Sequence, residues 1–115
     1  MCPLDYSLCR QTVTRYRLEN GGVMRKLLEG VRYEYGVSQV TDERGRHQET
    51  KCLLIVPGEA DLQPGDRIYD GAGPVMDARQ WNHFLPVTVK GLSEINYVTP
   101  WFWDGQLCHT EAGRK

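Results

Sequence analysis

Cysteine and histidine side chains near the two ends of the chain are the groups best suited to chemistry. Cys2 and Cys9 lie at the beginning, and Cys108 and His109 lie at the end. If the two ends meet, as chain ends often do, these thiolates and the imidazole could bind zinc. However, six residues separate Cys2 from Cys9, whereas zinc knuckles have two to four. Adjacent residues on a strand point to opposite faces, which also argues against Cys108 and His109 acting together. We therefore favour packing cysteines and expect no metal and no cofactor.

Nucleophilic catalysis needs a nucleophile within reach of a base, and the sequence pattern does not favour one. Cys108 fails the same facing test with its neighbour, and neither His47 nor His83 lies near a recognisable nucleophile motif. The glycines of segment 70–74 could suggest a phosphate-binding loop, but Pro74 lacks an N–H and no Lys-Ser or Lys-Thr follows. We expect no catalytic residue and predict that the protein is not an enzyme.

Composition points to one soluble domain spanning residues 1–115. Fourteen Lys and Arg residues nearly balance fifteen Asp and Glu residues, which removes the basic excess typical of nucleic-acid binding. The longest apolar run, Cys52–Val56, is far shorter than the roughly 20 residues of a membrane helix. The start of the chain has no basic leader and no apolar stretch, so we expect no signal peptide and a cytoplasmic origin. The thiols are then expected to be reduced, without a disulfide framework.

The elements that would position these side chains read mainly as strands. Alternation over residues 12–19 predicts a half-exposed strand, and Asn20-Gly21 predicts a tight hairpin into a second strand. Gly30 interrupts that strand and predicts a bulge or corner. Beyond it, alternate apolar side chains indicate a face that packs inward; they are Val31, Tyr33, Tyr35 and Val37.

A polar stretch, residues 39–51, then predicts a protruding hairpin tip. Its centre, residues 42–49, contains no apolar side chain. Loops often carry binding residues, yet most polar tips are simply solvated turns, and both interpretations stay open.

The second half of the chain predicts further short strands and a single helix. Cys52–Val56 reads as a strand covered on both faces, and residues 62–71 read as a short strand between two turns. Asp77 and Gln80 have the spacing of a capping box, which predicts a helix that ends at Pro86. Strands are expected over residues 87–89, 92–99 and 106–111, with an aromatic turn over 101–105 and a polar tail over 112–115. The predicted fold is mainly β: a small antiparallel β-barrel of six or seven strands with a long hairpin and one short helix.

Three consecutive aromatic residues, Trp101, Phe102 and Trp103, cannot all face one core. At least one should be exposed, either at a protein interface or as a plug over an open end of the barrel. The predicted protein-interface residues come from this run and from the hairpin tip; they are Glu43, Arg44, Arg46, His47, Trp101 and Trp103.

The order of these elements resembles small structural proteins of tailed bacteriophages and prophages. The likeness is carried by Thr12–Tyr16, by Gly30–Tyr33, by the polar hairpin followed by Leu53–Val56, by the Pro64–Gly71 segment and by Val98–Pro100. The chain is similar to minor capsid or head-tail joining (head-closure or stopper) proteins, near a poorly characterised prophage family with an ending like Cys108–Lys115. It departs from the joining proteins in the helix-like insertion Asp77–Leu85.

The resemblance implies a non-enzymatic component of the virion neck, made in the cytoplasm of the bacterial host. Such a protein would assemble as a ring and contact other neck proteins: the portal, an adaptor or the tail side. It implies no membrane and no specific nucleic acid as partners. The alternative function is a small β-barrel module of a bacterial cell that binds nucleic acid or protein.

Overall fold

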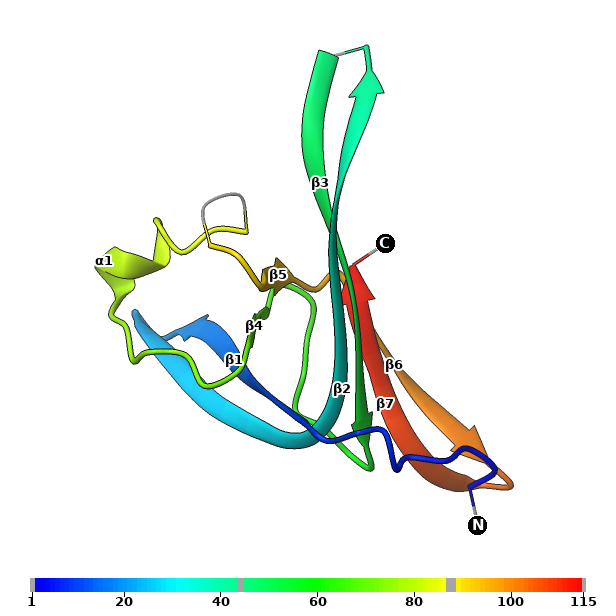
Figure 1. Ribbon diagram of the computed structural model, residues 1–115. Helices are drawn as coiled ribbons and strands as arrows, with labels where there is room; N and C mark the ends of the chain where they lie inside the picture. Colours follow the sequence, from blue (N-terminus) through cyan, green and yellow to red (C-terminus); the bar gives the residue numbers. More distant parts are fainter. Residues whose placement is uncertain (1, 44, 87–88, 115) are drawn as a thin grey trace.

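The computed structural model describes residues 2–43, 45–86 and 89–114, without the side chains at positions 37, 38, 40 and 47–50 (Figure 1). All seven strands of these ranges belong to one antiparallel sheet, in the order β5-β4-β1-β2-β3-β7-β6. The elements are β1 (Gln11–Glu19), β2 (Gly22–Asp42), β3 (Gly45–Pro57), β4 (Arg67–Asp70), α1 (Ala78–Trp81), β5 (Leu92–Glu94), β6 (Tyr97–Trp103) and β7 (Gln106–Arg114). The predicted mainly β fold with one short helix is confirmed.

The β1–β2 hairpin forms as predicted. Asn20 and Gly21 both have positive φ angles, 52° and 79°, and Glu19 pairs with Gly22. Asn and Gly tolerate this left-handed conformation better than other residues, so the pair turns the chain within two residues.

A bend at Gly30 divides β2 into two halves. A straight strand of this length would span about 70 Å, which exceeds the longest dimension of the molecule, 45 Å. Val31 pairs with Gln11 and Glu29 pairs with Thr12, so Gly30, at φ 70°, is the extra residue of a bulge. The predicted corner is confirmed: the first half of β2 pairs with β1 and the second half pairs with β3.

The sheet does not close into the predicted barrel. Its two edge strands, β5 and β6, follow each other in the chain and are separated only by Ile95 and Asn96. The pairing order makes β5 and β6 run in the same sense, and two residues are too few for the crossover that parallel neighbours require. The chain therefore passes from one edge to the other, held by bonds from the Ile95 N–H to the Asp66 carbonyl (3.0 Å) and from the Asn96 N–H to the Gly113 carbonyl (2.7 Å).

The core lies inside the curve of this sheet. The fully buried apolar side chains of its main cluster come from five strands and the β5–β6 link; they are Val13, Val31, Leu54, Ile68, Ile95 and Ala112. In β3, alternate residues are buried while Leu53 and Ile55 are half-buried, so the predicted cover over both faces of this strand is only partial.

Contrary to the prediction of a half-exposed strand, the centre of β1 is buried on both faces. On one face, Tyr16 donates a hydrogen bond to the Pro74 carbonyl (2.6 Å), and Thr14 donates one to the Gly71 carbonyl (2.8 Å). Arg15, on the other face, is covered by the loop after β3. Two loops distant in sequence thus cover a strand whose own alternation gave no sign of them.

Helix α1 has the predicted start but ends early. The Asp77 carboxylate accepts hydrogen bonds from the backbone N–H groups of Arg79 and Gln80, and the Gln80 side chain accepts one from the Asp77 N–H, which completes the capping box. The helix ends at Trp81 instead of Pro86. There the Arg67 guanidinium of β4 donates to the carbonyls of Trp81 (2.6 Å) and Phe84 (2.8 Å), so these groups do not continue the helix.

The C-terminal hairpin is longer than predicted. The aromatic residues 101–103 lie in β6, and the turn is formed by Asp104 and Gly105, both with positive φ. The expected polar tail continues β7 as far as Arg114, where Gly113 fits closely between Tyr97 and the Cys52 backbone. Positions 87 and 88 of the predicted strand 87–89 lie outside the described residues.

Candidate protein-interaction surfaces

The second half of β2 and the first half of β3 form a two-stranded arm, residues 36–51, that projects from the body of the protein (Figure 1). Every residue of the arm whose burial is described is exposed. The radius of gyration, 15.1 Å, exceeds the value of about 13 Å for a compact chain of this length. The predicted protruding hairpin is therefore present, although strands extend almost to its end.

The predicted interface residues of the hairpin lie at the far end of the arm. Glu43 and Arg46 are exposed on either side of the turn, beside the Asp42–Gly45 pair. Arg44 lies outside the described residues, and so does the side chain of His47. Among the residues that the structure describes, no group of His, Cys, Asp or Glu side chains at this end of the arm could hold a metal ion.

The root of the arm is fastened to the body at Tyr33. The Gln11 side chain donates to the Tyr33 carbonyl (3.1 Å) and accepts from its N–H (2.9 Å), as a neighbouring strand would. The buried Tyr33 hydroxyl donates to the Gly91 carbonyl at 3.2 Å, and burial raises its pKa. The arm therefore begins next to a residue that is hydrogen-bonded to the body through its backbone and its side chain.

A thiol lies beside an open hollow of about 360 Å³ at the root of the arm. The hollow is lined by Glu34, Tyr35, Gly36, Lys51, Cys52 and Leu53. Burial raises the pKa of the Cys52 thiol, which keeps it protonated and poorly nucleophilic. This arrangement suits packing, as the sequence suggested for the cysteines.

The tip of the β6–β7 hairpin carries an exposed aromatic group. Trp101 stacks on Trp103, with ring centroids 6.4 Å apart, and on His109, at 5.3 Å. Phe102 is 57% exposed and Trp103 is 50% exposed, whereas Trp101 is half-buried. The prediction that at least one of the three aromatic residues is exposed is confirmed. Large exposed aromatic side chains are enriched at protein interfaces.

The N-terminal segment covers the other side of His109. The Tyr6 hydroxyl lies 2.6 Å from His109 Nδ1, and the two rings meet edge to face. Burial lowers the pKa of His109, with a smaller opposing effect from Glu111. The imidazole is thus held by neutral ring contacts on both sides.

A disulfide joins Cys2 to Cys108, which corrects the expectation that these two thiols are reduced. Their Cα atoms lie 5.7 Å apart because the N-terminal segment runs along β7, a proximity that residue spacing in the sequence does not reveal. Trp101 pairs with His109 and Phe102 pairs with Leu107, so Cys108 is the extra residue of a bulge. Bulges re-aim side chains, and the same segment therefore reaches both Cys108 and His109.

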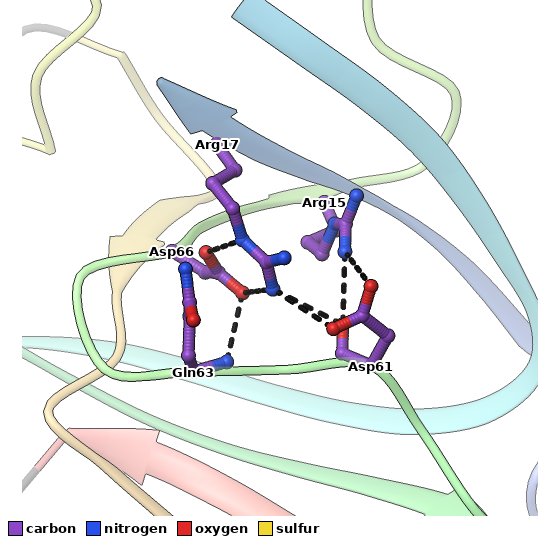
Figure 2. Close-up of polar contacts among 5 residues, drawn as sticks. All are labelled: Arg15, Arg17, Asp61, Gln63 and Asp66. Atoms are coloured by element: carbon purple, nitrogen blue, oxygen red, sulfur yellow. Dashed lines mark hydrogen bonds and ion pairs between the residues drawn. The ribbon is translucent and has the colours of Figure 1, made fainter. Parts of the chain in front are cut away.

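A cluster of arginines and carboxylates fastens the 58–66 loop onto β1 (Figure 2). Arg17 donates from Nε and Nη2 to the two carboxylate oxygens of Asp66, both at 2.8 Å, and Asp66 also accepts the Gln63 N–H at 2.9 Å. Arg15 donates to the carboxylate (3.1 Å) and the carbonyl (3.0 Å) of Asp61. Each guanidinium faces a carboxylate of the loop, so we assign this cluster a structural role.

The ion pairs of this cluster shift the pKa values of their members. Hydrogen bonding to Asp66 raises the pKa of Arg17, and hydrogen bonds from Arg17 and Arg15 lower the pKa of Asp61. Sequence reasoning missed the cluster because the partners of the β1 arginines come from a loop that lies 44 to 49 positions further along the chain. The only local signal is the placement of two arginines on one face of a strand.

Within the described ranges, no group of three or more His, Cys, Asp or Glu side chains could hold a metal ion. No helix among these residues is long and apolar enough to cross a membrane. The chain matches no protein-family model, no curated protein and no solved structure.

Proposed function

We propose that the protein is a non-enzymatic assembly protein of a phage or prophage virion, a head-tail connector or minor capsid component of the neck that docks through its arm. The observation that carries the proposal is the arm itself, a ribbon of exposed polar residues that extends from a compact body. The order of strands and turns resembles that of neck proteins, and this likeness supports the choice of assembly.

The backbone of the arm is suited to gripping another chain. Because both backbone groups of Tyr33 face Gln11, alternation turns those of residues 35, 37, 39 and 41 toward the same side. In the described part of the sheet, β2 pairs on this side only as far as Val31. An exposed strand edge of this kind can accept a strand from a partner. Two-stranded ribbons are marginal on their own, so a partner that adds a strand would also stabilise the arm.

The reactive side chains also support a structural role. Cys52 is buried, Cys108 is in a disulfide, and His109 is enclosed between Tyr6 and Trp101. Each of these groups is used in holding the fold.

Deletion of residues 43–48 tests the proposal. The remaining arm can close with Ser38 paired to Glu49 and a four-residue turn over 39–42, while the pairing nearer the body is unchanged. In an inducible prophage that carries this gene, loss of the gene should give filled heads without tails. A wild-type copy should restore infectious particles, and the deletion variant should not.

A matched control, Glu43→Ala with Arg46→Ala, keeps the length of the arm and removes two described charges from its end. Circular dichroism spectra and unfolding midpoints of the purified variants should match those of the wild type, which shows that the body still folds. Infectious particles in the absence of the gene, or full rescue by the deletion variant, would overturn the proposal. Failure of rescue by the double variant as well would assign the docking contact to the charged end.

A further inference from the structure

The N-terminal segment, residues 2–10, runs beside the β6–β7 hairpin (Figure 1). Two links join it to β7: the Cys2–Cys108 disulfide and the contact of Tyr6 with His109. Cys9, at the end next to β1, lies close to the bulge of β2 at Gly30.

Few other contacts hold this segment. Apart from the Tyr6–His109 contact, the hydrogen bonds described for residues 5–10 are internal: the Ser7 N–H to the Asp5 carboxylate, the Cys9 N–H to the Tyr6 carbonyl, and the Arg10 N–H to the Leu8 carbonyl. Arg10 also donates from its side chain to the Ser7 carbonyl. Pro3, Leu4, Asp5, Ser7 and Leu8 are exposed. The attachment to the hairpin is therefore concentrated at Cys2 and Tyr6.

The segment covers part of the aromatic surface at the tip of the β6–β7 hairpin, one of the candidate interaction surfaces. His109 is only 3% exposed, and its ring stacks on Trp101 of the aromatic tip. Loss of Tyr6 from this position would open one face of the imidazole and extend the exposed aromatic area from Trp103 through Trp101 to His109.

We propose that residues 2–10 are a redox-releasable strap over the aromatic tip. A dithiol reductant supplies two electrons and two protons: its thiolate attacks the less buried sulfur, that of Cys2, and the Cys108 sulfur leaves and is protonated. The second thiol of the reductant then displaces Cys2 and forms the reductant's own disulfide, which leaves two protein thiols. Of the two links to β7 described above, only the contact of Tyr6 with His109 then remains.

The remaining contact is too small to hold the strap. One hydrogen bond and one edge-to-face ring pair oppose the conformational entropy of nine ordered residues, most of them exposed. With the disulfide closed, the segment is fixed at both ends and Tyr6 is kept at high effective concentration beside His109. After reduction only the end that continues into β1 holds it, and this effective concentration falls. The proposal concerns a different part of the molecule from the arm, and it stands whether or not the arm docks.

Hydrogen–deuterium exchange with and without dithiothreitol tests the strap in the full chain. Reduction should speed exchange of the amides of residues 5–10 by roughly ten-fold or more, while the amides of β3 keep their protection. Diethyl pyrocarbonate should modify His109 faster in the reduced protein, because the reagent needs an accessible neutral imidazole.

Two serine variants sharpen the test. Cys2→Ser should exchange rapidly with or without dithiothreitol, whereas Cys9→Ser keeps the disulfide and should respond like the wild type. Equal exchange in oxidised and reduced wild-type protein would overturn the proposal, as would four alkylatable thiols in the protein purified without reductant. A disulfide that involves Cys9 would also overturn it. Because the wild-type comparison is sufficient, the test does not depend on the folding of either variant.

Discussion

Asp66 and Asp61 both bind Arg17, Asp66 from a buried position and Asp61 from an exposed one, and this contrast allows a quantitative test of what fastens the 58–66 loop. The side chain of Asp66 is 1% exposed, and that of Asp61 is 65% exposed. We predict that Asp66→Ala lowers the free energy of unfolding by about 3–5 kcal/mol, because it leaves the mostly buried Arg17 without its main partner. It also removes the acceptor of the Gln63 N–H. Asp61→Ala should cost about 1 kcal/mol or less, as solvent-exposed ion pairs do.

The expected shift in melting temperature follows from the size of the chain. At about 4 °C per kcal/mol, Asp66→Ala should melt at least about 12 °C below the wild type and Asp61→Ala within about 4 °C of it. Urea unfolding followed by far-UV circular dichroism measures both free energies, and Asp66→Asn, which keeps one acceptor oxygen, serves if the alanine variant does not fold. Equal losses at the two positions, or a loss below 1 kcal/mol at Asp66, would refute the reasoning that burial decides the strength of these pairs.

Two further predictions concern a crowded glycine and a buried imidazole. Gly73→Ala should destabilise the protein by about 1–3 kcal/mol in urea unfolding, because the added Cβ would collide with Tyr16. Gly36→Ala places its Cβ in open space and should be neutral or slightly stabilising. Equal effects of the two substitutions would contradict the packing described. Burial lowers the pKa of His109 in the folded state. As the pH falls, His109 therefore becomes protonated in the unfolded chain before it does in the folded protein. The free energy of unfolding should then decrease as the pH drops from 7 through 6.5 toward the lower folded pKa. Urea midpoints at pH 7 and 5 should therefore differ less in His109→Gln than in the wild type, and an unchanged difference would exclude His109 as the source.

The features that could be predicted from the sequence are those that depend on residues close together in the chain. Asn20-Gly21 specifies its hairpin because few other pairs tolerate two positive φ angles, and Asp77 with Gln80 specifies a helix start through their own hydrogen bonds. Gly30 marks the corner of β2 for the same local reason. These signals needed no knowledge of the rest of the chain.

The features that could not be predicted depend on residues far apart in sequence. The burial of β1 on both faces comes from loops that reach Thr14 and Arg15 from about 50 positions away. The Cys2–Cys108 disulfide joins residues at almost opposite ends of the chain. The expectation that Cys108 and His109 point to opposite faces assumed a regular strand, and the bulge at Cys108 breaks that regularity. Of the candidate interface, the exposure of at least one of the three consecutive aromatic residues could be predicted because they cannot share one face, but the strap beside them could not.

The two residues between β5 and β6 have a consequence for the handling of this protein. Within the part of the chain that the structure describes, Ile95 and Asn96 form the backbone link between β5 and β6, the two edge strands of the sheet. A proteolytic nick there would allow the two ends of the sheet to separate and would make the unpaired edges of β5 and β6 more accessible to other chains. Unpaired strand edges can pair with the edges of other molecules. We therefore expect the nicked protein to aggregate, even though the nick breaks none of the hydrogen-bonded strand pairs within the sheet.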